Sequence, residues 1–167
     1  MNISEARGRN NVRLYRDEER LACQALFESN VPDYFASVER KDFNAYLDDL
    51  KGPYFVMEDE TGAIVACGGY ASDKEEPAVA VLCWGMVRHG LHGSGIGRQL
   101  LAERLRRIAS ESQYSLVRIE TTQYSRGFFE RFGFTAERVV PDGFAPGFDL
   151  VEMELDLSKQ DKAEQWS

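Results

Sequence analysis

The sequence predicts a single-domain α/β (α+β) fold, and three observations support this class. The 167 residues, 43% of them apolar, are enough to build one compact core. Residues 78–120 alternate between strand, helix and strand, which is the pattern of a β-α-β unit. A β-hairpin pattern precedes this unit and two further strand patterns follow it. No internal repeat or low-complexity linker divides the chain.

The chain opens with a strand pattern and a helix pattern. We expect a short strand at Val12–Tyr15. A helix is predicted at Asp17–Ser29, with an apolar stripe through Leu21, Ala25 and Phe27 or Glu28.

A second helix and a hairpin come next. Residues 38–49 predict the helix, after a turn-rich, aromatic loop at 29–35. The runs 54–58 and 63–70 predict the two strands of a hairpin, with Gly62 at the position that needs a positive φ.

The central part carries the β-α-β unit. Residues 78–87 form a continuous apolar run typical of a buried strand, residues 97–110 an amphipathic helix, and residues 116–120 an alternating strand. A short helix is expected at 125–132, with Ser125 as its N-cap and Gly133 at its C-terminal end.

The C-terminal part predicts two strands and a polar tail. The strands are expected at 135–140 and 150–157, joined by a loop rich in glycine and proline at 141–148. We expect the tail, 158–167, to be frayed.

Composition argues against several classes of protein. No run of about 18 apolar residues predicts a membrane span, and residues 1–11 lack the apolar stretch of a signal peptide, so we expect a cytoplasmic protein with no membrane partner. The three cysteines, Cys23, Cys67 and Cys83, lie in apolar stretches, which favours reduced core thiols over disulfides or a metal site. The net charge of −8 argues against binding of nucleic acid.

Charge is unevenly distributed along the chain. Residues 14–87 hold 15 acidic and 6 basic residues, a balance of 6 − 15 = −9. Residues 88–138 hold nine arginines and five glutamates, a balance of 9 − 5 = +4. The acidic part favours cationic ligands and the basic part favours anionic ones. The same counts are also expected if these residues are ordinary charges on the solvent-exposed surface.

A glycine-rich loop between the predicted strand and helix of the central unit predicts an anion site. The sequence from His92 to Arg98 is HGSGIGR. Glycines let the backbone approach a ligand closely, and the free N–H groups at the start of the following helix attract negative charge. We therefore expect the loop to bind a phosphate or pyrophosphate.

Two common phosphate-binding motifs fit this loop poorly. A P-loop needs Gly-Lys followed by Ser or Thr, whereas this loop ends in Gly97-Arg98. A dinucleotide fingerprint needs Gly-x-Gly-x-x-Gly and an acidic residue about 20 residues on. Glu120 could provide the acid, but the glycines at 93, 95 and 97 have the wrong spacing.

The segment from Val87 to Gly97 resembles motif A of the GNAT N-acetyltransferase superfamily, in which Gln or Arg, two residues, Gly, one residue, and Gly or Ala follow one another. His92 stands where the family usually has Gln or Arg. Further along, Phe128–Phe134, with the sequence FFERFGF, is similar to motif B. The two motifs occur in the family's order, and the resemblance extends over about Tyr54 to Leu157.

This resemblance implies a fold and a division of the chain. The fold is a mixed, mostly antiparallel sheet of about six or seven strands with flanking helices and a splay between the fourth and fifth strands. One domain would cover 1–167, with the N-terminal strand and acceptor-side helices in 12–53, the acetyl-CoA core in 54–157 and the tail beyond. The segments 27–35 and 143–149 resemble bacterial members of the superfamily, without indicating a substrate.

The resemblance also implies acetyl-CoA as cofactor and direct attack of an amine on its thioester, with no covalent enzyme intermediate. The residues expected to hold the pantetheine and thioester are Gly85, Met86 and Val87, with the amide of Val87 as the oxyanion donor. Those expected at the pyrophosphate are His92, Gly93, Ser94, Gly95, Ile96, Gly97 and Arg98. The remaining residues expected to bind the cofactor lie in motif B and just after the strand before it, and they are Thr122, Phe128, Phe129 and Arg131.

The general acid of the family is missing. Motif B normally offers a tyrosine that protonates the CoA sulfur, but this position is Phe129, which has no proton to donate. Water, Tyr124 or Ser125 is expected to take that role. The position where the family often has Asn is Thr122.

The general base is not clear from the sequence either. Many family members use a glutamate of the fourth strand, but residues 78–87 contain no carboxylate. A base acting through water is therefore expected, with Glu120 the best-placed acid and Asp33, Tyr34 and His89 as weaker candidates.

The acceptor is expected to be a small-molecule or peptide amine. Asp33, Tyr34 and Phe35 lie in the loop that would meet it, and the acidic first part of the chain favours a cationic amine such as a polyamine, an aminoglycoside or a lysine-like group. Monomer and homodimer both stay open.

Two other functions stay open. Because the tyrosine and the strand glutamate are absent, a non-catalytic acyl-CoA-binding sensor or interaction module of the same fold is the main alternative. A nicotinamide-binding domain is a weaker one.

Overall fold

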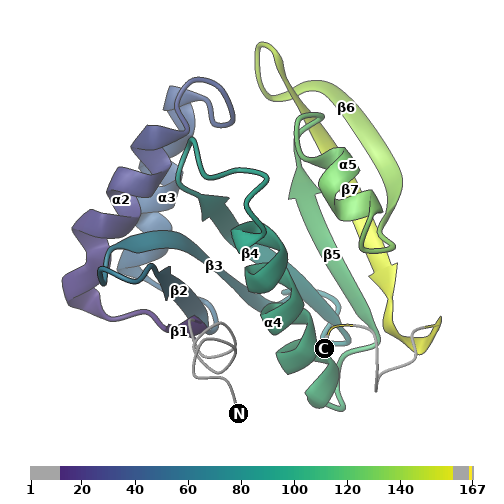
Figure 1. The fold of residues 1–167 in the computed structure, drawn as a ribbon. Coiled ribbons are helices and arrows are strands. Elements are labelled where there is room, and N and C mark those ends of the chain that lie inside the picture. The colour runs from purple at the N-terminus through teal and green to yellow at the C-terminus, as the bar shows by residue number, and fades with distance from the viewer. Residues whose placement is uncertain (1–11, 160–165, 167) are drawn as a thin grey trace.

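A computed structural model describes residues 12–159 and Trp166, and its centre is one seven-stranded sheet with the order β1-β2-β3-β4-β5-β7-β6 (Figure 1). The strands are β1 (Val12–Leu14), β2 (Tyr54–Glu58), β3 (Ile64–Ser72), β4 (Val79–Val87), β5 (Leu116–Thr121), β6 (Thr135–Ala145) and β7 (Phe148–Asp156). Only β4 and β5 are parallel, and all other neighbours are antiparallel. The predicted mixed, mostly antiparallel sheet is therefore confirmed.

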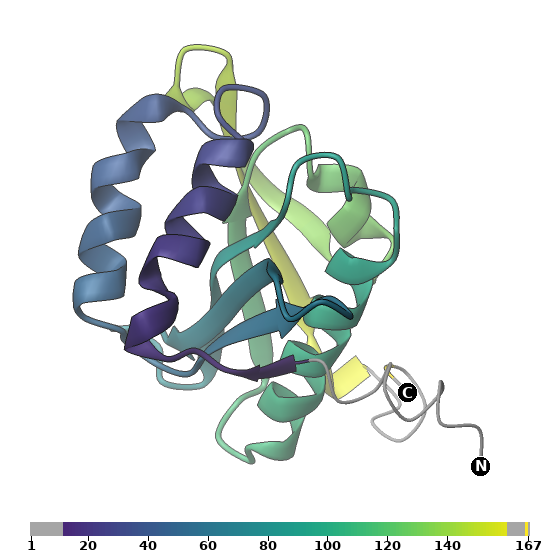
Figure 2. The same ribbon diagram turned by 60° about the vertical axis from the view of Figure 1, so that its left-hand side comes forward.

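Helices cover both faces of the sheet. The helices α2 (Arg20–Ser29) and α3 (Arg40–Asp48) lie together on one face, and α4 (Ile96–Ser110) crosses the other (Figures 1 and 2). The short helix α5 (Arg126–Glu130) lies next to β6. Single 3₁₀ turns occur at η1 (Asp17–Glu19), η2 (Ser37–Glu39) and η3 (Leu157–Lys159).

Each face of the sheet has its own core, and β2 contributes to both. Phe55 and Met57 belong to the cluster packed under α4, whereas Tyr54 and Val56 belong to the cluster under α2 and α3. Successive side chains of a strand point to opposite faces, so a strand covered on both sides is apolar throughout. This explains why β2 and β3 are nearly continuous apolar runs in the sequence.

The predicted apolar stripe of α2 is wrong. Leu21 is 79% exposed and Ala25 is also exposed, while Cys23, Leu26 and Phe27 are buried. Successive residues are about 100° apart around a helix, so Phe27 cannot share a face with Leu21 and Ala25. The aromatic ring of Phe27 goes to the core, and the other two residues therefore face solvent.

The loop predicted at 141–148 is also wrong. β6 continues to Ala145 and β7 begins at Phe148, so most of this segment is strand and the turn is limited to Pro146 and Gly147. A Cβ atom at Gly143 would lie 2.5 Å from Cβ of Leu150. This glycine therefore allows close approach of two strands and does not mark a loop.

The other predicted elements are confirmed to within a few residues. Gly62 has φ +85° in the β2–β3 hairpin, and Gly133 has φ +97° after α5. Ser125 is the N-cap of α5, although its side chain makes no capping hydrogen bond. The N-terminal stretch 1–11 and most of the tail 158–167 lie outside the described residues. None of the described helices has the length and apolar character needed to cross a membrane.

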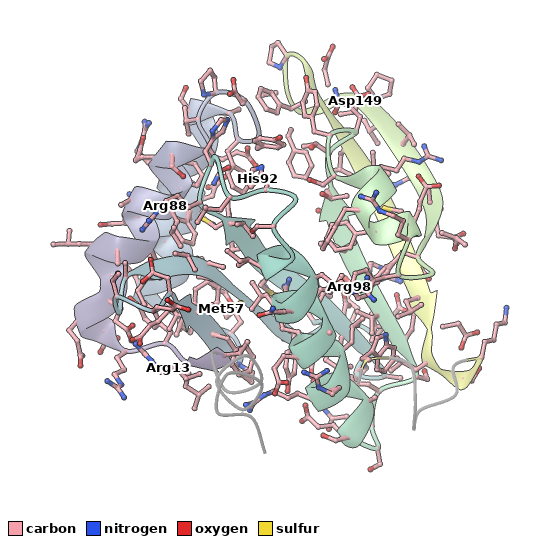
Figure 3. The ribbon with its side chains drawn as sticks, viewed as in Figure 1. Arg13, Met57, Arg88, His92, Arg98 and Asp149 are labelled. Carbon is pink, nitrogen blue, oxygen red and sulfur yellow. The ribbon has the colours of Figure 1, made fainter. Side chains whose placement is uncertain are left out.

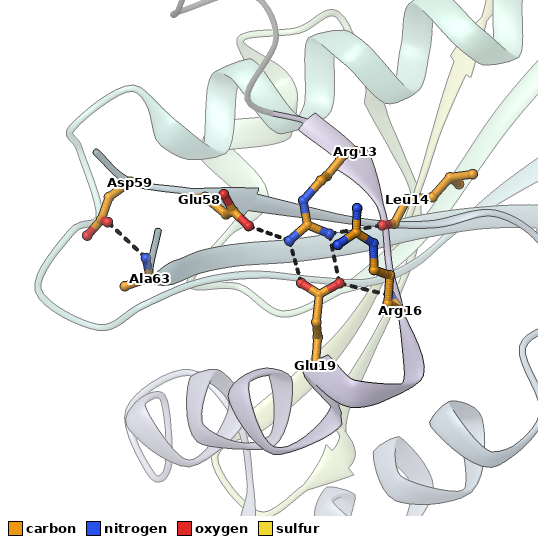
Figure 4. A network of polar contacts seen from close by, with 7 residues as sticks. All are labelled: Arg13, Leu14, Arg16, Glu19, Glu58, Asp59 and Ala63. Atoms are coloured by element: carbon orange, nitrogen blue, oxygen red, sulfur yellow. Dashed lines mark hydrogen bonds and ion pairs between the residues drawn. The ribbon is translucent and has the colours of Figure 1, made fainter. Parts of the chain in front are cut away.

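A polar network fixes β1 to the start of the first helix (Figure 4). Arg13 donates from Nη1 and Nη2 to the two carboxylate oxygens of Glu19, both at 2.7 Å, and Nη2 also bonds to Glu58 of β2. Glu19 accepts a further bond from the backbone N–H of Arg16 at 3.0 Å. The bond from Arg13 holds the pKa of Glu19 below its usual value.

Candidate functional site

The parallel strands β4 and β5 are paired only at one end. Val79–Val81 pair with Leu116–Arg118, and among the described residues no pairing between these strands extends further (Figure 1). A cleft of about 2070 Å³ opens where the strands separate. It is lined by β4, the loop before α4, β5, α5 and the segment between α2 and α3.

The strand β4 is irregular where the cleft begins. Cys67 of β3 lies opposite Met86 and Gly69 opposite Cys83, so Trp84 and Gly85 face a single residue of β3. Trp84 has φ +44°, which is unusual for a residue other than glycine. The sequence predicted a regular strand here, and the glycine at 85 was the only local signal of a bulge.

Beyond the bulge, the peptide groups of Val87 face away from β3. The N–H of Arg88 bonds to Val65 O at 2.9 Å, so the backbone N–H and C=O of residue 88 point toward β3. Those of its neighbour Val87 therefore point away from β3. The carbonyl of Val87 accepts hydrogen bonds from Nδ2 of Asn30 and Nε2 of His92, both at 2.9 Å. Its N–H points to the same side, where β5 has already separated from β4.

The glycine-rich loop leads directly into α4. Gly93 and Gly95 have φ +82° and +90°, Gly95 is the N-cap of the helix, and a Cβ atom at either would meet nothing within 4 Å. The first N–H groups of the helix have no partner within it. Arg98 in the first turn is exposed and, like His92, lines the cleft (Figure 3). The loop is thus open, and the free N–H groups of the helix start and the positive charge of Arg98 lie beside it.

The two sequence motifs meet in space. A Cβ atom at Gly97 would lie 3.4 Å from Cγ2 of Val87 and 3.6 Å from Cζ of Phe128. The start of α4 is therefore packed between β4 and α5. Phe129 is buried at 6% exposure, and its ring lies against Phe128 and the core.

Most of the predicted cofactor residues line the same cleft. They are Gly85, Met86, Val87, His92, Gly93, Gly95, Gly97, Arg98, Thr122, Phe128, Phe129 and Arg131. Two loop residues are not among those that line it. The Ser94 hydroxyl donates to Leu91 O at 2.5 Å, and Ile96 packs against the core.

Two of the three predicted acceptor residues line the cleft. Tyr34 and Phe35 line the cleft, where the ring of Tyr34 meets that of His92 edge-on at 4.4 Å between centroids. Asp33 is not among the cleft residues and instead pairs with Nε2 of His89 at 2.9 Å.

The two predicted catalytic residues both line the cleft. Glu120 is exposed on β5. The hydroxyl of Tyr124 donates to the carbonyl of Gly147 at 3.0 Å, and its ring packs edge-on against Phe148. In this structure the hydroxyl of Tyr124 thus holds the β6–β7 turn.

Sequence reasoning missed four cleft residues that have a buried polar atom without a hydrogen-bond partner in the described part of the chain. Asn30 is 2% exposed and ties the end of α2 to Val87, while its Oδ1 has no partner among the described residues. Arg104, Arg118 and Trp166 likewise each bury a side-chain nitrogen that has no hydrogen-bond partner in the described part of the chain. Their environment depends on contacts between distant segments, so no local pattern announced them.

No group of three or more His, Cys, Asp and Glu side chains within residues 12–159 could hold a metal ion.

Comparison with known proteins identifies the family. Residues 23–157 match the family described as "Acetyltransferase (GNAT) domain". No curated protein sequence matches the chain.

Solved structures share the fold at low sequence identity. A ribosomal-protein-alanine N-acetyltransferase from Brucella melitensis has a TM-score of 0.70 at 20% identity, over 87% of this chain and 98% of that one. An N-acetyltransferase from Staphylococcus aureus Mu50 has a TM-score of 0.67 at 21% identity, over 87% and 97%. An aminoglycoside 6′-N-acetyltransferase solved with coenzyme A has a TM-score of 0.68 at 12% identity, over 87% and 96%.

The match to the family covers most of the chain, and the fold and both motifs agree with it. This chain belongs to the GNAT acetyltransferase family.

Proposed function

We propose that this protein transfers an acetyl group from acetyl-CoA to a primary amine of a small molecule or peptide. The observation that carries the proposal is the cleft between β4 and β5, which connects the outward-facing amide of Val87 to the glycine-rich loop at the start of α4. Family membership and the fold shared with N-acetyltransferases support it.

The residues present suit acetyl-CoA, which supplies an acyl group activated as a thioester. The amides of Ile96, Gly97 and Arg98 are free to bind the pyrophosphate, and the arginines at 98 and 131 add positive charge. The absence of side chains at Gly93 and Gly95 leaves the approach open.

Val87 would stabilise the charge that develops on the acyl oxygen. Its N–H, in the peptide that joins residues 86 and 87, faces the cleft. Asn30 and His92 hold its carbonyl, in the following peptide, and so restrain the backbone at Val87 before any ligand binds. The amine nitrogen forms a bond to the acyl carbon as the carbon–sulfur bond breaks and its electron pair leaves with sulfur. We assign Glu120, through water, to take the proton of the amine; Tyr124, Ser125 or water would protonate the sulfur.

The lining of the cleft favours a cationic acceptor, because carboxylates and aromatic rings are the groups that bind ammonium ions. The carboxylates that line it are Glu39, Asp42, Asp73, Glu75, Glu120, Glu130 and Glu152, and its rings include Tyr34, Phe35, Tyr46, Tyr124 and Phe144. The proposal includes a cytoplasmic location, because the free thiols of Cys23 and Cys67 suit a reducing compartment.

A screen of amines tests the activity. Release of free CoA is measured with acetyl-CoA and a panel containing a polyamine, an aminoglycoside, a lysine-containing peptide and a dicarboxylic amino acid. We expect turnover with cationic amines and little with the dicarboxylic amino acid. Turnover confined to the acidic member would contradict the assignment of acceptor class.

The proposed base is tested by Glu120→Gln, with Glu137→Gln on β6 as the exposed control. We expect kcat to fall about 100-fold with unchanged affinity for acetyl-CoA, because a general base typically contributes a factor of this order. Equal activity of the two variants would remove Glu120 from the mechanism.

A second candidate is a non-catalytic acyl-CoA-binding module. It is favoured by Phe129, which cannot donate a proton, and by the engagement of the Tyr124 hydroxyl with Gly147. Tight binding of acetyl-CoA with no release of CoA across the whole panel would support this candidate against the enzyme.

A further inference from the structure

Arg104 of α4 is the only charged residue that is buried among those the structure describes, with 3% of its surface exposed. Its Nη1 donates to the carbonyl of Gly69 at 3.2 Å, and its Nε has no partner among the described residues. It also lines the cleft between β4 and β5.

No described carboxylate lies within ion-pair distance of Arg104. Arg118 of β5, in contrast, has three acidic partners, Asp73, Glu76 and Glu154. A buried charge that lacks a partner is costly, because it loses its hydration without an opposite charge to replace it. An arginine that is buried without a counter-ion in the protein indicates that its charge acts on a negatively charged group of a ligand.

Two glycines make room for the guanidinium. A Cβ atom at Gly85 would lie 2.9 Å from Nη2 of Arg104, and one at Gly68 would lie 3.1 Å from its Cζ. These glycines are on adjacent strands at the bulge, next to Trp84 with its positive φ. The charge therefore lies directly against the part of β4 that leads to Val87.

Arg104 stays protonated and positively charged at neutral pH. Burial lowers the pKa of Arg104 only to about 10. The titratable groups that interact with it are Tyr46 on α3, Tyr54 on β2, Cys67 on β3 and Cys83 on β4. Burial raises the pKa of each of these four groups, so they are neutral and do not cancel the charge.

We propose that Arg104 stabilises the negative charge on the CoA sulfur after acyl transfer, in place of the proton donor that is missing at Phe129. This inference rests on the proposed function. As the new carbon–nitrogen bond forms, the electron pair of the carbon–sulfur bond goes to sulfur. The guanidinium stabilises that charge electrostatically without giving up a proton, and the thiolate is protonated by water.

The direct test is the ionisation of the thiol of CoA bound to the protein. The thiolate is followed by its ultraviolet absorbance as pH is raised, with the complex of the S-methyl thioether of CoA as the blank. The thiol of free CoA, titrated in the same way, gives the reference, and we expect the bound thiol to titrate about one unit lower or more.

Variants test whether Arg104 causes the lower pKa of the bound thiol. Arg104→Met removes the charge and should return the thiol to about its free pKa, whereas Arg104→Lys should keep most of the shift. Arg106→Met, which removes an exposed arginine of the same helix that pairs with Glu103, should leave it unchanged. In kinetics, Arg104→Met should lower kcat at least tenfold with little change in KM for acetyl-CoA.

A measurement on the unmodified protein covers the case in which Arg104→Met does not fold. The affinity of CoA is compared with that of its S-methyl thioether across the same pH range. We expect CoA to bind increasingly more tightly than the thioether as pH rises through the lowered pKa.

The outcomes separate this inference from the function on which it rests. Parallel pH dependence for the two ligands, or the same thiol pKa with and without Arg104, would overturn the role of Arg104 even if acetyl transfer is observed. Absence of any CoA binding would overturn the proposed function and this inference together.

Discussion

Gly68 and Gly85 leave the space that the guanidinium of Arg104 fills, and Asn30 fixes the carbonyl of Val87. These contacts join residues that are far apart in the sequence. The sequence predicted the glycine-rich loop from His92 to Arg98, between a strand and a helix, because its motif is local. It could not predict Arg104 or Asn30, because their partners depend on the register of β3 and β4.

The close packing at Gly85 predicts a large effect of adding one methyl group. Gly85→Ala should lower the free energy of unfolding by about 1–3 kcal/mol, because the Cβ atom would overlap the Arg104 guanidinium. Gly127→Ala, in the short helix α5 with nothing within 4 Å of the new Cβ, is the control and should be neutral or stabilising. Urea unfolding measures both, and equal effects of the two variants would contradict the packing described here.

The link from Asn30 to Val87 predicts a combined effect on stability and binding. Asn30→Ala removes hydrogen bonds to Leu26 O and Val87 O and should cost about 1–2 kcal/mol of stability. It should also weaken acetyl-CoA binding several-fold, since the backbone at Val87 is no longer restrained through its carbonyl. Calorimetric titration checks the second effect, with Asn44→Ala, which breaks a bond between α2 and α3, as the control. Unchanged affinity in Asn30→Ala would show that this link is only structural.

Among the helices and strands, prediction succeeded where the pattern was long and regular and failed where two patterns competed. The β2–β3 hairpin and the β4-α4-β5 unit have strong periodicity, and both are confirmed. In α2 two apolar stripes are available, and burial of Phe27 selects the one that includes Cys23 and Leu26. In β6 glycine and proline suggested a loop, although Gly143 serves close strand packing.

The junction between β1 and the first helix predicts a pH-dependent contribution to stability. The pKa of Glu19 is lowered in the folded protein by its bonds from Arg13, so this pair stabilises the fold above the unfolded pKa of about 4.3 and loses that effect as pH falls. Glu19→Gln should therefore cost about 1 kcal/mol near neutral pH.

The difference in unfolding free energy between the native protein and Glu19→Gln should shrink as pH falls below about 4. Urea unfolding at several pH values checks this, with the exposed neighbour Glu18 changed to Gln as the control. A cost of Glu19→Gln that is the same at low and neutral pH would rule out the ion pair as its cause.

At the scale of the whole molecule, the cleft is a consequence of where the strands β4 and β5 stop pairing. α2 and α3 cover one face of β2–β4, and α4 covers the other (Figures 1 and 2). Separation of β4 from β5 then leaves backbone groups without strand partners between two packed layers. The predicted splay came from family resemblance. Composition and periodicity alone predict a β-α-β unit, but they do not show where its two strands stop pairing.

The central claim is that the cleft between β4 and β5 binds acetyl-CoA through the glycine-rich loop. Calorimetric titration of acetyl-CoA tests it, beside Gly95→Glu and Ser94→Glu, which place a carboxylate in the loop. The second variant avoids the strain of a side chain at the positive φ of Gly95. Gln113→Glu, an exposed change after the far end of α4, is the control for added charge.

We expect micromolar binding to the native protein and to the control, and loss of binding in both loop variants. Absence of binding to the native protein, or full binding with a carboxylate at position 94 and at position 95, would contradict the account.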